Sequence, residues 1–181
     1  MTIMALWQPI LASAVITFIA GAAIWMAMPW HKRDWQKTPD EEAVRAALSG
    51  TDPGMYSLPH CDPAQFKDPE MKQKFKDGPQ AFITVLPGGV PQMGGKLLLM
   101  FVYNLLVGIL CAYFVSRTAA PGADYLAIFR IAGTVAFTAY GFAYVQESIW
   151  FGRSWSLTAK TFLDAMIYGV LTGGTFGWLA A

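Results

Sequence analysis

The chain has 181 residues, of which 55% are hydrophobic and only 14% are charged, and its formal net charge is +1 at pH 7. An ordinary soluble domain carries about 25% charged residues, so this composition indicates a membrane protein. A net charge near zero produces no field that attracts nucleic acid, and we expect no nucleic-acid partner. The two cysteines are too few to form a disulfide framework.

Four apolar segments are long enough to cross a bilayer, which takes about 20 helical residues. They cover residues 9–28, 97–116, 126–149 and 161–180, and most of the charged residues lie between the first two. The sequence therefore predicts an all-α membrane protein with four transmembrane helices and one soluble insert. We place the first helix in residues 1–29, the insert in residues 30–95, and helices two to four in residues 96–181. No basic residue precedes the first segment, so we expect it to be retained and not cleaved as a signal peptide.

Local signals predict two short helices in the insert. Thr38-Pro39-Asp40-Glu41 matches a capping box with proline at the first helical position, which predicts a helix that runs to about Leu48. A second helix is predicted over residues 69–76, because Asp68 can cap its start and Gly78 can end it.

Two further segments of the insert, residues 55–58 and 81–86, are predicted to be extended. Each is bounded by prolines and contains the aromatic and branched side chains that are common in strands. We expect them to pair as a small β-hairpin. Pro87-Gly88-Gly89 and Gly94-Gly95 predict a flexible link from the insert into the second transmembrane helix.

Conventional metal ligands are few in this sequence. His31, His60 and Cys61 occur without the Cys-x-x-Cys or His-x-x-x-His spacing of metal sites. We therefore predict no metal site and no cofactor, and a metal- or pigment-binding electron-transfer protein is the weakest of our alternatives. The sequence also contains no hydrolase, zinc-protease, kinase or P-loop motif, so we predict that the protein is not an enzyme.

Basic residues near the ends of the four segments predict the orientation of the chain. One side has six of them and the other has two, Arg117 and Arg130. The positive-inside rule then places the insert and the turn at residues 151–160 in the cytoplasm and both termini outside, in a bacterial inner membrane. The bases on the cytoplasmic side are Lys32, Arg33, Lys37, Lys96, Arg153 and Lys160. The tryptophans expected to anchor the same interface are Trp30, Trp35, Trp150 and Trp155.

Two polar side chains lie inside the second and third predicted helices. We expect Asn104 to form an interhelical hydrogen bond that fixes the register of two helices, worth about 1 kcal/mol. Arg130 lies one turn inside the third helix, where its side chain can reach the outer headgroups.

Two carboxylates, Glu147 and Asp164, lie just inside the third and fourth predicted helices. Because these helices are antiparallel and joined by a short turn, we expect both at a similar depth. We favour ion pairs with Arg153 and Lys160 of the turn. The alternative is a proton or cation path, because carboxylates inside a bilayer commonly mark such routes.

Gly169, Gly173 and Gly177 repeat at a four-residue spacing in the fourth predicted helix. This spacing leaves one helical face without side chains and predicts close contact with another helix. The partner could be the small side chains of the first helix or a neighbouring subunit, and we favour the neighbouring subunit.

Four short sequences carry a resemblance to a known group of proteins. They are Met28-Pro29-Trp30, Pro53-Gly54-Met55-Tyr56, residues 147–152 and residues 168–178. In these the chain resembles uncharacterised bacterial inner-membrane proteins with four spans and one soluble insert. The resemblance implies that architecture and no particular activity.

These observations favour a non-enzymatic membrane protein that assembles through its small-residue helix faces. It would be a structural or accessory subunit of a larger membrane complex, such as a respiratory or photosynthetic one, or a homo-oligomer. Its expected partners are membrane lipids and either other membrane subunits or further copies of itself. The alternative function is a small transporter or a proton- or cation-conducting protein that uses Glu147 and Asp164.

Overall fold

The computed structural model describes residues 2–181, which are mostly helical and form two compact units. The helical unit contains residues 2–35 and 92–181, and the second unit is Gln36–Pro91.

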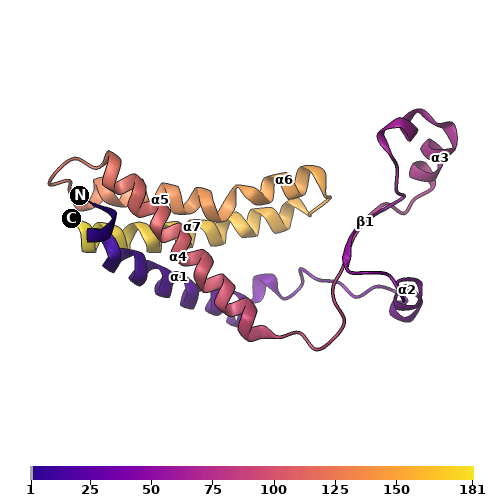
Figure 1. Ribbon diagram of the computed structural model, residues 1–181, viewed down its shortest axis with the longest axis horizontal. Helices are drawn as coiled ribbons and strands as arrows, with labels where there is room; N and C mark the ends of the chain where they lie inside the picture. Colours follow the sequence, from indigo (N-terminus) through magenta and orange to yellow (C-terminus); the bar gives the residue numbers. More distant parts are fainter. Residues whose placement is uncertain (1) are drawn as a thin grey trace. The chain divides into compact units, whose positions relative to one another are not determined.

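The helical unit is built from long helices that run antiparallel to one another along the chain (Figure 1). The end of α1, the start of α4 and the α6–α7 turn lie at one end of this bundle (Figure 1). The start of α1 and the end of α7 lie at the opposite end. The elements are η1 (Ile3–Leu6), α1 (Trp7–Ala27), η2 (Pro29–His31), α4 (Met93–Thr118), α5 (Tyr125–Gly141), α6 (Ala143–Trp150) and α7 (Trp155–Ala180).

Local sequence explains where several of these helices begin and end. Pro29 follows directly after α1 and cannot continue its hydrogen-bond pattern. Asp124 caps α5, because its carboxylate accepts a hydrogen bond of 2.8 Å from the backbone N–H of Ala127. The turns before α5 and α7 contain Gly122 and Gly152 with φ of +74° and +70°, a conformation that favours glycine.

Three stretches are long and apolar enough to cross a membrane: Ile3–Ala27, Met93–Thr118 and Tyr125–Trp150. The third joins α5 and α6, which meet at Phe142 with its backbone still in the right-handed helical region. α7 corresponds to the fourth predicted span and has 26 residues. It is not among these three stretches, and it contains several glycines and threonines together with Asp164.

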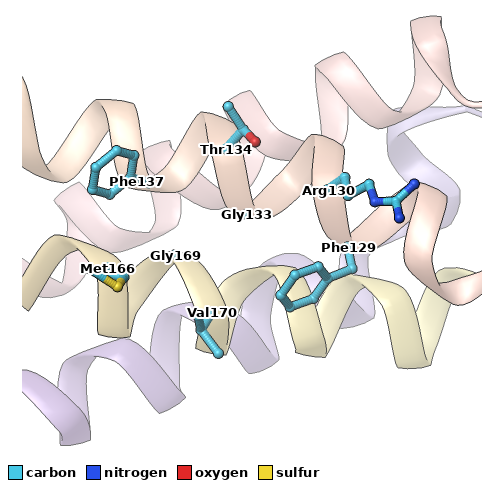
Figure 2. A pocket seen from close by; sticks show the side chains of 8 residues that line it. All are labelled: Phe129, Arg130, Gly133, Thr134, Phe137, Met166, Gly169 and Val170. Atoms are coloured by element: carbon cyan, nitrogen blue, oxygen red, sulfur yellow. The ribbon is translucent and has the colours of Figure 1, made fainter.

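The glycine face of α7 packs against α5 of the same chain (Figure 2). A Cβ atom built at Gly169 would lie 3.0 Å from the carbonyl oxygen of Gly133, and one at Gly173 would lie 2.8 Å from that of Phe129. At Gly177 the neighbour is Tyr125. The prediction that this face serves a neighbouring subunit or the first helix is therefore wrong. The close contact is real, but its partner is α5.

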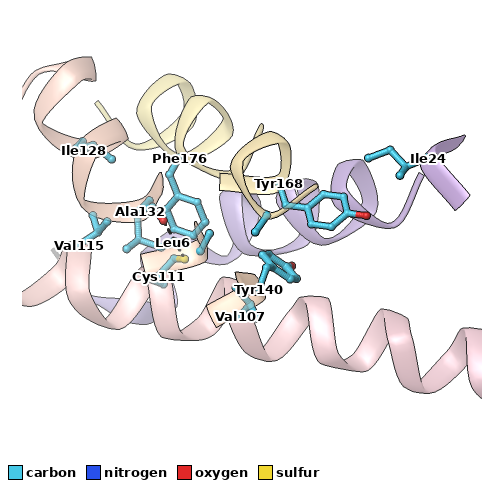
Figure 3. Packing of buried hydrophobic residues seen from close by; sticks show 13 residues of the cluster. Leu6, Ile24, Val107, Cys111, Val115, Ile128, Ala132, Tyr140, Tyr168 and Phe176 are labelled. Carbon is cyan, nitrogen blue, oxygen red and sulfur yellow. Dashed lines mark hydrogen bonds between the residues drawn. The ribbon is translucent and has the colours of Figure 1, made fainter. Parts of the chain in front are cut away.

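The apolar core lies where α1, α4, α5 and α7 meet (Figure 3). Phe176 of α7 and Ile128 and Ala132 of α5 are completely buried there. Cys111 of α4 donates a hydrogen bond from Sγ to the carbonyl oxygen of Ala132 at 3.4 Å. Towards the end of the bundle that contains the α6–α7 turn, the core continues to Tyr140 and to the residues around Asp164.

The second unit contains the predicted pair of short helices and a two-stranded antiparallel sheet. Strand β1 pairs with β2 so that Gly54 lies opposite Val85 and Leu58 opposite Ala81. This confirms the predicted hairpin-like pairing of the two extended segments. The elements are α2 (Glu41–Ala47), β1 (Gly54–Leu58), η3 (Pro63–Lys67), α3 (Pro69–Asp77) and β2 (Ala81–Val85).

The predicted cap of α3 is confirmed, whereas that of α2 is wrong. Asp68 caps α3 by accepting a hydrogen bond from the N–H of Glu70. α2 is capped by Asp40 and not by Thr38, because the Asp40 carboxylate accepts from the N–H of Ala43 at 2.9 Å. Aspartate is a stronger cap than threonine, so the later of the two competing caps sets the first turn.

Two of the long helices begin earlier than predicted. α4 starts at Met93, so Gly94 and Gly95 lie in its first turn and do not form a flexible link. α7 starts at Trp155, which brings Lys160 onto the helix beside Thr161. Both side chains take part in the site described next.

Candidate functional site

The candidate site is centred on Asp164, a carboxylate of α7 that is only 3% exposed. Its Oδ1 accepts a hydrogen bond of 3.3 Å from the indole N–H of Trp30, and its Oδ2 lies 2.8 Å from Nε2 of His31. Trp30 and His31 belong to η2, far earlier in the sequence. A carboxylate in an apolar bundle is costly unless it is paired, and these two residues provide the pairing.

His31 extends this network through its second ring nitrogen. Its Nδ1 lies 2.5 Å from Oδ2 of Asp34, and Trp25 stacks on the imidazole with ring centroids 4.1 Å apart. Lys160 of α7 donates hydrogen bonds to Oδ1 of Asp34 and, at 2.6 Å, to the carbonyl oxygen of Trp30. The network therefore ties the segment after α1 to the first turns of α7. We refer to Trp30, His31, Asp34, Lys160 and Asp164 as the His31 cluster.

The hydrogen bonds of His31 determine how many protons the cluster holds. An ionised carboxylate can only accept hydrogen bonds, so each of the two carboxylates needs a donor on the ring nitrogen that faces it. Either both ring nitrogens carry a proton or one carboxyl group does. His31, Asp34 and Asp164 together then have a net charge of −1, which the ammonium group of Lys160 balances. The His31 cluster is therefore neutral.

Asp34 lies after α1, outside the apolar stretches, and its side chain is buried. Burial alone would raise the pKa of this carboxyl group. The hydrogen bonds from Lys160 and His31, together with their charges, outweigh burial and hold the pKa of Asp34 below its usual value. The ionised form of Asp34 is therefore stabilised in the folded protein.

A cavity of about 340 Å³ lies directly beside the His31 cluster and shares Asp164 with it. It is formed by α1, α4, α5, α6 and α7 at the end of the bundle that contains the α6–α7 turn. Its lining is largely aromatic, with three polar groups set among the rings. The lining residues are Trp25, Met100, Tyr103, Tyr140, Tyr144, Arg153, Thr161, Asp164 and Tyr168.

Arg153 is the cation of this cavity. Its guanidinium group lies over the ring of Tyr144, 4.5 Å from the centroid, and its Nη2 donates to the hydroxyl of Thr161 at 3.1 Å. Its buried Nε has no hydrogen-bond partner among the described residues. No carboxylate within residues 2–181 forms an ion pair with it.

Two tyrosines shape the inner wall of the cavity. Tyr140 donates a hydrogen bond of 3.1 Å to Oδ1 of Asn104, which joins α5 to α4 as predicted for this asparagine. Tyr168 reaches across to α1, where a Cβ atom at Gly21 would lie only 3.2 Å from its hydroxyl. Gly21 thus leaves room for the phenol of Tyr168 at the cavity wall.

The predicted ion pairs of the two carboxylates with the turn are wrong. Asp164 pairs with His31, and Lys160 pairs with Asp34. Glu147 is exposed on α6, does not line the cavity, and makes no ion pair with Arg153 or Lys160 in the described chain. The two carboxylates are therefore in different environments, because only Asp164 faces the inside of the bundle.

The predicted interface anchors divide into two groups. Trp35, Trp150 and Trp155 are exposed, as an interfacial role requires, and that role stays a prediction. Trp30 instead turns inward to Asp164.

Arg130 is exposed on α5, beside a shallow cavity of about 250 Å³ against α7 (Figure 2).

Sequence reasoning missed the partnership of His31 and Asp34 with Asp164. Two signals were available in the sequence. A histidine and an aspartate three residues apart directly follow one apolar helix, and a single carboxylate lies inside a second apolar helix. No family model, curated protein or solved structure matches this chain.

Proposed function

We propose that the chain is a non-enzymatic integral protein of the bacterial inner membrane that crosses the bilayer four times. Large apolar side chains such as Ile19, Leu98 and Leu106 are exposed on the helical unit, which supports this proposal. Soluble proteins rarely expose contiguous apolar surface on this scale. α7 supplies the fourth crossing, because Gly169, Gly173, Gly177 and Asp164 are buried while Met166 and Val170 face outward.

The proposed orientation places residues 36–91 in the cytoplasm and both termini outside. Cys61 lies partly exposed in the second unit, whereas Cys111 is buried in the helical unit. We expect a membrane-impermeant maleimide to label Cys61 only after spheroplasts are opened. The Cys61→Ser variant keeps Cys111 and is the control, because any labelling that it shows is the background from Cys111. Labelling of Cys61 in intact spheroplasts would reverse the proposed orientation.

Within this architecture we propose an accessory role in which the cavity beside Asp164 holds a ligand. The cavity and its position carry this proposal. Beyond Tyr140 and Tyr168, the bundle interior is filled by completely buried apolar side chains such as Ala132, Ala136 and Phe176. A cavity that ends against such a core favours binding over passage.

The alternative of proton or cation conduction is tested in proteoliposomes. We expect the wild-type protein to add no proton leak to that of protein-free vesicles, with an added protonophore as the positive control. A wild-type leak that Asp164→Asn abolishes, and that the matched change Glu147→Gln leaves intact, would replace the accessory role by conduction through Asp164.

The accessory role implies assembly with other membrane subunits or with further copies of this chain. Because the glycine face of α7 is occupied by α5, such contacts use other surfaces, on the outer faces of the helices or on residues 36–91. Purification in a mild detergent followed by mass measurement tests this part of the proposal. A monodisperse monomer without copurifying proteins would contradict it.

A further inference from the structure

We propose that the cavity beside Asp164 binds an oxyanion, a phosphate or carboxylate head carried by an amphiphile. The head would lie against Arg153 and the apolar body among the aromatic side chains. This inference rests on the proposed ligand-holding function, since it names the ligand of the same cavity.

Arg153 provides the first step. Arginine has five N–H donors, and the protein supplies a hydrogen-bond acceptor to one of its nitrogens, through Thr161. A guanidinium group held at the end of an apolar bundle without a counterion is costly. The planar arrangement of its donors fits the oxygens of a phosphate or a carboxylate. An oxyanion would therefore satisfy both the charge and the free donors of Arg153.

Asp164 does not supply this missing charge, although it lines the same cavity. Both of its oxygens are engaged by the η2 segment: Oδ1 accepts from the indole N–H of Trp30, and Oδ2 shares a hydrogen bond with Nε2 of His31. The net charge of the His31 cluster is zero without Arg153. The cavity therefore has a net charge of +1, which comes from the Arg153 side chain. The neutrality of the cluster is what allows an anion to approach so close to a carboxylate.

The other residues that line the cavity indicate what the uncharged part of the ligand is. Trp25, Met100 and Tyr103 present rings and a thioether to a cavity of about 340 Å³, far more space than a lone phosphate fills. Cavities of about 300–1,000 Å³ hold drug-sized ligands. The ligand therefore needs an apolar portion in addition to its charged head.

The same three side chains are exposed on the outer surface of α1 and α4. Trp25 lies two residues from the end of α1, whereas Met100 and Tyr103 lie in the first half of α4. In the proposed membrane arrangement this side of the cavity therefore faces the apolar layer on the cytoplasmic side. A molecule that already resides in the bilayer can reach Arg153 through this side. An anionic lipid is accordingly the source that the geometry favours over an anion from solution.

The test uses the full chain in a neutral detergent, with decyl phosphate as the probe. We expect decyl phosphate to raise the melting temperature in a saturable manner and decyltrimethylammonium to leave it unchanged. Arg153→Gln should raise the dissociation constant at least about tenfold, the loss expected for a charge-assisted hydrogen bond. Arg130→Gln is the matched control and should bind like the wild type, because Arg130 lies outside this cavity.

A second variant keeps the test decisive if Arg153→Gln fails to fold. Met100→Trp fills the apolar part of the cavity from an exposed position on α4 and leaves Arg153 in place. It should weaken decyl phosphate binding about tenfold or more, as expected when an apolar group loses its buried area. Unchanged binding in Met100→Trp would overturn the assignment of the ligand to this cavity.

The remaining outcomes separate the sources of the anion. Inorganic phosphate that gives the full shift alone would keep the oxyanion site and overturn the amphiphile. Equal shifts in the wild type and Arg153→Gln would overturn the site itself. The proton-leak assay is independent of these results. A proton leak through the wild-type protein, together with saturable binding of decyl phosphate, would contradict only the proposed function. No binding of decyl phosphate to the wild type, without a proton leak, would contradict only this inference.

Discussion

The contact between α5 and α7 makes a specific prediction for two adjacent glycines. A Cβ atom at Gly173 would lie 2.8 Å from the backbone oxygen of Phe129 and 3.0 Å from the Cα atom of Gly133. A Cβ atom at Gly174 would meet only the hydroxyl of Tyr125, at an ordinary contact distance of 3.5 Å. Gly173→Ala and Gly174→Ala therefore make the same chemical change in different surroundings.

The difference between the two variants can be worked out from these distances. Each replaces a helical glycine by alanine, which favours the helix by about 1 kcal/mol. At position 173 the new methyl group has to push backbone atoms apart, and overpacking of this kind costs about 1–3 kcal/mol. We expect Gly173→Ala to melt below Gly174→Ala by about 2–12 °C, because 1 kcal/mol corresponds to about 2–4 °C in a chain of this length.

The assay is thermal unfolding in a mild detergent, with the folded fraction measured by size-exclusion chromatography. Gly173→Leu should lower the melting temperature further, since its side chain is larger. If Gly173→Ala were as stable as Gly174→Ala, the two helices could not be as close as described. A variant that altered oligomeric mass but not monomer stability would instead place this face between subunits.

Three further predictions use the same melting assay. Asp164→Asn should cost about 3 kcal/mol by breaking a buried charge pair, whereas the matched change Glu147→Gln on the exposed side of α6 should stay within about 0.5 kcal/mol; equal costs would contradict the buried pairing. Tyr140→Phe should cost about 1–2 kcal/mol, because it leaves Asn104 buried without its donor, and a cost near zero would argue against that interhelical bond. The lowered pKa of Asp34 means that its ionised form contributes stability fully above about pH 4 and loses it as the pH falls through the folded value. The stability difference between the wild type and Asp34→Asn should therefore be constant above about pH 4 and shrink as the pH falls below that value, and a difference that grew would reverse this sign.

Features set by neighbouring residues were predictable from the sequence. The Asp68 cap and the Gly78 stop of α3 act within a few residues, and the structure reproduces them. The apolar runs of α1 and α4 are long enough to identify these helices from composition alone. The contact of Asn104 with another helix also followed, since an amide in an apolar span needs a partner.

The candidate site was only half predictable, because its groups come together through tertiary packing. Asp164 stood out as a carboxylate in an apolar segment, but the sequence offered several cations as partners. The turn residues Arg153 and Lys160 were nearer in sequence than His31, yet sequence distance does not decide which side chain packs against the buried face. Likewise, a tryptophan at the edge of a span has the same local pattern whether it anchors in headgroups or, like Trp30, donates to a buried carboxylate.

The low hydropathy of α7 follows from its position in the bundle. Its small residues allow close contact with α5, and Asp164 is held by η2. The hydroxyls of Thr161 and Thr175 donate to the carbonyl oxygens one turn earlier in the same helix, at 3.0 and 2.8 Å. A mean hydropathy weighs buried and outward positions equally, whereas in the proposed arrangement lipid would meet only the outward ones, which on α7 include Met166 and Val170. A helix of this kind can cross a bilayer once its polar face is covered, so the fourth crossing that we propose for α7 depends on α5 and η2 being packed against it.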